Sequence, residues 1–123
     1  MKAMSKLIVG PYSRFALIPA NKDTVHLSGH IGNDAETGKL VSGGFSNQVK
    51  QAFNNLSETL EMAEIGKENI VKATVFLTDM SNFDEMNKLY VEYLGEHRPA
   101  RSCVAVKQLP KGADFEIEAI AYK

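Results

Sequence analysis

Two residues near the end of the chain have side chains suited to carboxylate and water chemistry. Arg101 carries a planar guanidinium that can hold a carboxylate through two parallel hydrogen bonds. Glu116 carries a carboxylate that can orient and partly deprotonate a water molecule beside a bound substrate. An arginine and a glutamate on paired strands are more often a surface ion pair of small energetic worth. The residue types alone therefore leave an ion pair and a catalytic pair both open.

The sequence around these residues predicts a β-hairpin. The segment 103–106 is small and β-branched, 110–112 reads Pro-Lys-Gly and is typical of a turn, and 115–121 alternates with a period of two. Two strands joined this closely are expected to pair antiparallel. We therefore expect Glu116 or Glu118 to lie near the Arg101–Cys103 end of the partner strand.

The rest of the chain predicts the element order β-β-β-α-β-α-β-β. Apolar residues recur at helical spacing in two segments, and each stripe can cover only one face of a sheet. We therefore predict an α+β fold with a single mixed sheet and two helices packed on one face. The other face keeps apolar groups, which favours a partner subunit as its cover. The expected elements are strands at 7–9, 15–19 and 24–28, a helix capped by Ser46 and closed by Gly66, a strand at 69–78, and a helix capped by Ser81 and ended by Gly95.

Length and composition narrow the class of protein. The chain has 123 residues, enough for one domain with a substantial core, and its apolar content of 44% is ordinary for a globular protein. A net charge of −1 argues against a protein built mainly to bind phosphate backbones. No run is long enough to span a membrane, and Met1 to Lys6 lacks the apolar core of a signal peptide. The sequence thus predicts a cytoplasmic protein.

Cysteine and histidine usage predicts no structural metal and no disulfide. Cys103 is the only cysteine, which fits a reducing compartment. His26, His30 and His97 show no metal-ligand spacing with Cys103 or with one another. A thiol nucleophile would need a base and an orienting group beside it, and the sequence names none. Cys103 is therefore expected to line a pocket rather than to attack a substrate.

Several short motifs occur along the chain. They are Pro-Ala-Arg-Ser at 99–102, Leu-Pro-Lys-Gly-Ala at 109–113, Glu-Ile-Glu-Ala-Ile-Ala at 116–121, Gly-Pro-Tyr-Ser at 10–13, Leu-Ser-Gly at 27–29 and the segment 82–90. These motifs make the chain similar to the reactive intermediate deaminase (Rid) family, also labelled endoribonucleases L-PSP or translation inhibitors. The resemblance covers residues 7–121 and indicates one domain over 1–123. It implies a chorismate-mutase-like fold and a homotrimer with a site at each subunit interface. The family usually has glutamine where this chain has Arg14 and His30; His30 is then either a loop histidine without chemistry or a residue that alters the substrate range.

The resemblance also implies an activity and a site. Family members hydrolyse small 2-imino acids, such as 2-iminobutanoate and 2-iminopropanoate, to 2-oxo acids and ammonia. Arg101 would hold the substrate carboxylate and Glu116 the water, while the backbone of Cys103 would bond the substrate. No cofactor is required, because the imine is already an activated electrophile and positioning can supply most of the rate gain. The substrate-binding set implied in this way is Tyr12, Ser28, Asn87, Arg101 and Cys103.

Two other classes of function remain open from the sequence. An endoribonuclease or translation inhibitor would bind RNA, but near-neutral charge and the lack of a basic-aromatic stripe weigh against RNA binding as the main role. A non-catalytic trimer that senses small carboxylates or holds client proteins would keep Arg101 but would need no water-positioning glutamate. The presence of Glu116 favours the deaminase.

Overall fold

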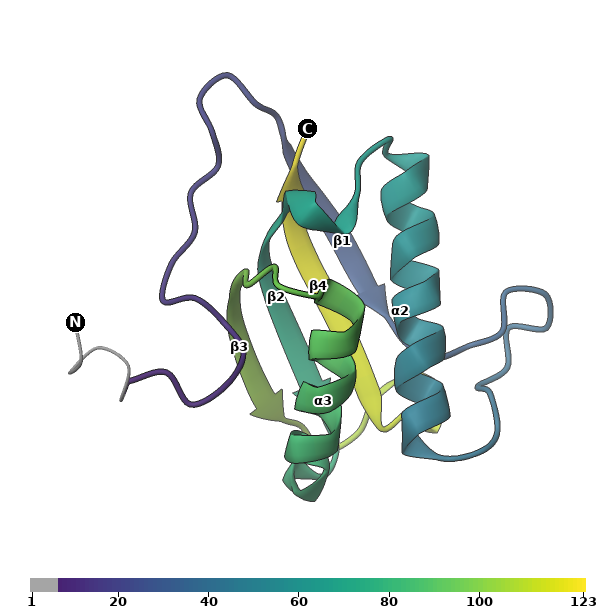
Figure 1. Ribbon diagram of the computed structural model, residues 1–123. Helices are drawn as coiled ribbons and strands as arrows, with labels where there is room; N and C mark the ends of the chain where they lie inside the picture. The colour runs from purple at the N-terminus through teal and green to yellow at the C-terminus, as the bar shows by residue number, and fades with distance from the viewer. Residues whose placement is uncertain (1–6) are drawn as a thin grey trace.

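The computed structural model describes residues 7–123 and shows one mixed sheet covered on one face by two helices (Figure 1). The strand order is β1-β4-β2-β3, with β4 antiparallel to both of its neighbours and β2 parallel to β3. This confirms the predicted α+β class. The expectation about a signal peptide at 1–6 lies outside the described residues. The elements are β1 (Thr24–His30), α2 (Phe45–Met62), η1 (Lys67–Asn69), β2 (Ile70–Leu77), η2 (Met80–Asn82), α3 (Phe83–Leu94), β3 (Ala100–Ala105), η3 (Pro110–Gly112) and β4 (Phe115–Tyr122).

The predicted hairpin is wrong, because β2 lies between β3 and β4. The helix α3 returns the chain beside β2, so β3 pairs parallel with it. The connection that follows β3 then passes the end of β2, where the Val106 amide donates to Leu77 O and the Thr78 amide donates to Asp114 O. The chain therefore enters β4 on the far side of β2. The Pro-Lys-Gly sequence at 110–112 predicts that the chain changes direction there. It does not determine which strand β4 then pairs with.

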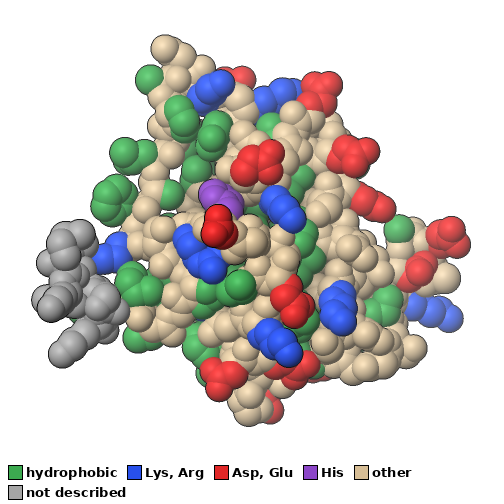
Figure 2. Space-filling view, in the orientation of Figure 1, with side chains coloured by type: hydrophobic (Ala, Val, Ile, Leu, Met, Phe, Trp, Pro, Cys, Tyr) green, Lys and Arg blue, Asp and Glu red, His purple; other side chains and the backbone are tan. Residues whose placement is uncertain are grey.

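The two predicted strands at 7–9 and 15–19 are also absent. The segment before β1 touches the sheet at an isolated bridge between Ser13 and Ala100, and the chain then runs out past β3 to reach β1 (Figure 1). Phe15 and Leu17 are 72% and 78% exposed. Figure 2 shows hydrophobic side chains standing out along this part of the surface. The alternating pattern is present, but residues 7–123 of the chain offer no partner strand for it.

The ends of the first helix differ from the sequence prediction. Helix α2 starts at Phe45 after Gly44, whose φ of 94° suits glycine, so Ser46 lies in the first turn and makes no cap. The helix ends at Met62, and Gly66 precedes η1 instead of closing α2. These shifts move the ends of the helix but leave its predicted apolar stripe facing the sheet.

The second helix begins later than predicted. The Asp79 carboxylate accepts the Ser81 amide at 2.9 Å, so Asp79 caps the short η2 turn that leads into α3. Ser81 is therefore inside that turn and is not the cap. Gly95 ends α3 with a φ of 65°, as the sequence predicts.

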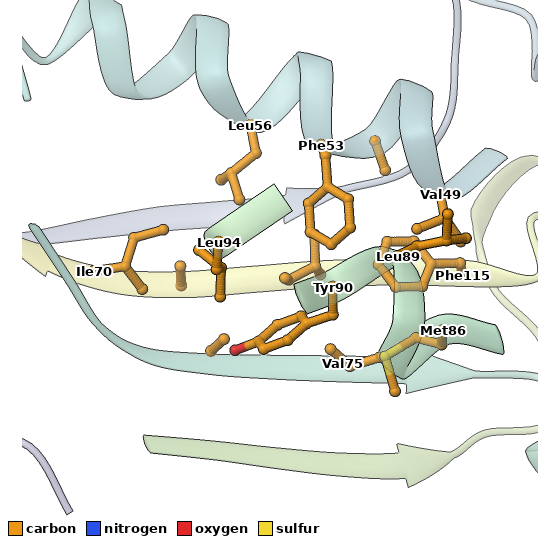
Figure 3. Close-up of a cluster of buried hydrophobic side chains, with 14 of the residues drawn as sticks. Val49, Phe53, Leu56, Ile70, Val75, Met86, Leu89, Tyr90, Leu94 and Phe115 are labelled. Carbon is orange, nitrogen blue, oxygen red and sulfur yellow. The ribbon is translucent and has the colours of Figure 1, made fainter. Parts of the chain in front are cut away.

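The core fills the space between the helices and the sheet. Phe53 of α2 stacks on Tyr93 with ring centroids 4.3 Å apart and meets Phe115 of β4 edge-on at 5.7 Å. Figure 3 shows Tyr90 of α3 lying between the helices and β2. A register irregularity between Ile70 and Lys72 turns Ile70 into this core, although simple alternation places it on the opposite face. Among residues 7–123, no helix combines the length and apolarity that crossing a membrane demands.

Candidate functional site

The Arg101 side chain is buried in an aromatic cage at the β3 edge of the sheet. Its guanidinium carbon lies 4.9 Å from the ring centre of Tyr90, 5.4 Å from that of Tyr12 and 5.8 Å from that of Phe83. Aromatic faces attract a cation, so the three rings offset part of its desolvation. The side chain is only 7% exposed. The cage is built by α3 together with the segment that precedes β1.

No acidic residue neutralises this buried cation. Within residues 7–123 the one ion pair joins Lys123 to Glu64, far from the cage in the sequence and at the surface. Nη1 of Arg101 donates to Asn87 Oδ1 at 2.7 Å, while the buried Nε finds no hydrogen-bond partner in the part of the chain that the structure describes. Burial lowers the pKa of Arg101 from its ordinary value, opposed by Tyr90, Cys103 and Tyr12. A buried charge normally has a partner, so this arrangement is chemically suited to binding an anion.

Asn87 and Tyr12 both act on Arg101 in this structure. Asn87 accepts the Nη1 hydrogen bond and so fixes the plane of the guanidinium. Tyr12 is turned toward it by a tight bend, in which the Tyr12 amide donates to Gly10 O at 2.9 Å. A side-chain carbon at Gly10 would lie 2.8 Å from Nη2 of Arg101. Glycine is therefore needed there for the backbone to approach the guanidinium.

Cys103 lies half-buried two residues after Arg101. Burial raises the pKa of its thiol, and Arg101 lowers it to a smaller extent. The thiol is thus not arranged as a thiolate nucleophile. The Pro99 carbonyl accepts the Ser13 amide on the outer edge of β3, whereas the Val106 amide points to β2. Because backbone groups alternate along a strand, Cys103 points its own backbone groups to the outer edge, as Pro99 does.

Glu116 lies on the other side of the molecule. Its neighbours Phe115 and Ile117 are buried against the helices, so the Glu116 side chain leaves the opposite face of β4. Its carboxylate lies over Gly29, where a side-chain carbon would collide with it. Burial, followed by Glu118, raises the pKa of the Glu116 carboxyl, and His30 opposes the rise. The residue borders a pocket of about 470 Å³ between β1, α2 and η3.

Comparison with known proteins shows the family. The model of the family described as Endoribonuclease L-PSP matches residues 4–123. The chain belongs to this family, the Rid family. A human 2-iminobutanoate/2-iminopropanoate deaminase is 42% identical over 113 residues, 92% of this chain and 80% of the human protein. Crystal structures of RidA from Psychrobacter and of Escherichia coli TdcF with bound serine have TM-scores of 0.79 and 0.77, at 40% and 33% identity, covering 94% of this chain and 91% of each of those chains.

In this Rid chain the residues singled out from the sequence form two groups rather than one. Tyr12, Asn87, Arg101 and Cys103 meet at the β3 edge. Glu116 and Ser28 lie on β4 and β1, beyond β2 in the strand order. The expected approach of Glu116 to Arg101 within one chain is therefore wrong, because it depended on the hairpin.

Sequence reasoning missed the residues that hold the site in place. Phe83 and Tyr90 looked like ordinary core residues, because a helical stripe does not reveal that its edge meets a cation. His30 is the last residue of β1 and borders the Glu116 pocket, so it is not a loop histidine without neighbours. The Gly29-His30 pair directly after a predicted strand was the available signal.

Replacing Gly29 by Ala is expected to lower imine hydrolysis about 100-fold with little loss of stability. The new methyl group would displace the Glu116 carboxylate, a flexible group whose movement leaves the fold intact, and misplacement by about 1 Å can cost this much in rate. Steady-state kinetics and thermal unfolding measure the two effects. If the loss passes through Glu116, Gly29→Ala will add almost nothing in a Glu116→Gln background. Additive losses would contradict this reading.

Proposed function

We propose that the protein is a 2-iminobutanoate/2-iminopropanoate deaminase, which hydrolyses reactive imines and their enamine forms to 2-oxo acids and ammonia. The observation that carries the proposal is Arg101, a buried guanidinium with aromatic walls and no acidic partner. A substrate carboxylate would supply the missing charge through a bidentate contact. The deaminase name of the human relative supports the reaction, and bound serine in TdcF supports a small carboxylate as ligand.

The site is completed by a second subunit. Arg101 faces α3 at the β3 edge, whereas Glu116 leaves the opposite face of the sheet near β1. One small imino acid cannot touch both side chains of one chain. Glu116 of a neighbouring subunit would therefore meet the substrate held by Arg101, with the Cys103 backbone and Tyr12 on the same wall as Arg101. Asn87 positions Arg101, and Ser28 borders the Glu116 side.

The assembly is a homotrimer with a site at each interface. Phe15 and Leu17 expose an alternating apolar segment, and a partner chain would cover it. Beyond the bond from the Ser13 amide to Pro99 O, the outer edge of β3 presents backbone groups for which residues 7–123 supply no partner strand, and a neighbouring subunit would meet them. In a ring of three copies, each interface joins one surface of a subunit to a different surface of the next subunit. The same pair of surfaces meets at all three interfaces. The lone Cys103 thiol supports a cytoplasmic location, where thiols stay reduced.

The reaction needs only positioning and one proton carrier. Water adds to the carbon of the protonated imine while one of its protons passes to the Glu116 carboxylate, and the resulting amino alcohol then takes that proton on nitrogen. The C–N bond breaks as the hydroxyl proton returns to the Glu116 carboxylate, which gives the 2-oxo acid and ammonia. Ammonia takes up that last proton and leaves as ammonium, so Glu116 is ionised again. The raised pKa of Glu116 makes its carboxylate a better base for this step than an exposed glutamate. No cofactor takes part.

The direct test is to generate 2-iminobutanoate or 2-iminopropanoate in situ and to follow its loss with and without protein. We expect the protein to accelerate loss of both imines and to release ammonia in equal amount. A single-stranded RNA incubated in parallel tests the endoribonuclease reading. Unchanged imine loss would contradict the proposed function, and RNA cleavage without imine turnover would favour the nuclease. Tight carboxylate binding without turnover would favour a non-catalytic trimer.

Replacing Cys103 by Ser is expected to keep most of the imine hydrolysis, within about threefold, because the backbone rather than the thiol bonds the substrate. Cys103→Pro should reduce it severely, because proline removes the amide proton and fixes φ. Imine kinetics on both variants, with circular dichroism as a check on folding, measure the difference. Loss of activity in a folded Cys103→Ser variant would restore the thiol to the mechanism.

A further inference from the structure

The His30 ring is held at both nitrogens at the end of β1. Nδ1 lies 2.7 Å from the Ser28 carbonyl oxygen, and Nε2 lies 2.7 Å from Thr59 Oγ1 of α2. A carbonyl oxygen only accepts hydrogen bonds, so Nδ1 carries a proton in every charge state of this arrangement. The charge on His30 therefore depends on whether Nε2 also carries one.

The bonds of Thr59 decide which charge state the network satisfies. Thr59 Oγ1 lies 3.3 Å from the Asn55 carbonyl oxygen and has one proton to give. If His30 is neutral, that proton can go to Nε2 or to Asn55 O, and one acceptor is left without it. If His30 is an imidazolium, Nε2 donates to Thr59 and Thr59 donates to Asn55 O. All three contacts are then satisfied by the charged ring.

The pocket puts this ring beside Glu116. His30 pairs with Ile117 across the β1–β4 ladder, and both His30 and Glu116 border the same pocket. The other charged groups that border this pocket are Glu58 from α2 and Lys111 from η3. Glu118, further along β4, raises the pKa of Glu116, whereas His30 lowers it. His30 thus counters the burial and the like charge that favour the neutral acid.

We propose that His30 is a positioning residue for catalysis: its imidazolium, tied to Ser28 and Thr59 on the border of the same pocket, keeps the Glu116 carboxylate in the ionised form that handles the water. The inference rests on the proposed function, in which Glu116 handles that water. The effect depends on the charged ring, so it is largest on the acid side. A glutamine can copy the hydrogen bonds of His30 but not its charge.

The test compares His30→Gln with wild type in two measurements. The first is kcat/KM for 2-iminobutanoate from pH 5 to 8. Activity needs ionised Glu116 and falls as the pH drops through its pKa; without the imidazolium we expect this acid limb to move up by about half a pH unit or more. Turnover near pH 5.5 then falls severalfold, while turnover at pH 8 stays within about twofold of wild type. The second is the carboxyl carbon-13 titration of Glu116, assigned with Glu116→Gln, which should move in the same direction.

Two further variants separate charge from structure. His26→Gln, on the exposed face of the same strand, should leave both curves unchanged. Thr59→Val keeps the imidazole but removes its partner, and should shift both curves upward by less than His30→Gln does. Coincident titrations in wild type and His30→Gln overturn the proposal, as does a shifted titration with an unchanged pH–rate profile. If wild type fails to hydrolyse imines, the proposed function falls, and the carboxyl titration still decides whether His30 acts on Glu116.

Discussion

Replacing Arg101 by Met is expected to lower imine hydrolysis at least about 100-fold without loss of stability. A charge-assisted hydrogen bond to the substrate carboxylate contributes roughly 1.5–3 kcal/mol, and loss of orientation adds to the kinetic effect. Met fills the aromatic cage with an apolar chain, so the buried charge disappears without a large cavity. Such replacements are often neutral or stabilise a protein by about 1–4 kcal/mol. Imine kinetics and thermal unfolding of the same preparation measure both results.

Arg101→Lys is the matched variant that separates carboxylate binding from simple charge. Lysine keeps the positive charge but cannot form the planar fork, so we expect it to recover little activity. If the site instead bound RNA phosphates, lysine would serve nearly as well and activity would fall steeply with salt. Full turnover by Arg101→Met, or cleavage of RNA that depends on Arg101, would contradict the deaminase. A large fall in melting temperature in Arg101→Met would show that the cage depends on the cation.

The sequence predicted the layers of the fold better than the connections between its strands. The apolar stripes of α2 and α3 and the alternation of β2 and β4 are local patterns, and the structure packs them as expected. Strand neighbours are not local information. The connection before β4 is short enough for a hairpin and long enough to pass the end of β2, and no residue within it distinguishes the two paths. The mistaken hairpin therefore followed from pattern reasoning that was otherwise sound.

The candidate site was predicted residue by residue but not in space. The motifs shared with the family pointed to Arg101 and Glu116, and the predicted hairpin, which the structure does not contain, placed them together in one chain. The structure separates them, although both keep the environments that their proposed chemistry needs: a cage without an acid for Arg101, and a pocket over glycine for Glu116. The alternating segment at Phe15 and Leu17 is likewise left exposed, because a single chain does not cover it. A neighbouring chain would bring a Glu116 to Arg101 and would also cover this segment.

Mixing two inactive variants is expected to restore activity. Arg101→Met chains keep Glu116, and Glu116→Gln chains keep Arg101, so each pure variant should be nearly inactive. In randomly mixed trimers about one interface in four joins an intact Arg101 to an intact Glu116, so the mixture should recover about a quarter of wild-type turnover. Co-expression in equal amounts, followed by imine kinetics on the whole unselected preparation, measures the recovery. Sedimentation at low micromolar concentration checks that wild type and both variants are trimers.

The control for this experiment removes the complementary residue. Arg101→Met chains mixed with chains that carry both substitutions contain no intact Arg101, so their mixed trimers should stay inactive. If Arg101 and Glu116 act within one chain, the first mixture also stays inactive although the trimers form. A monomeric wild type would remove the interface altogether. Recovery near a quarter requires that one active site draws its carboxylate anchor and its water-holding carboxylate from different subunits, which is the arrangement that we propose because Arg101 and Glu116 leave opposite faces of the sheet.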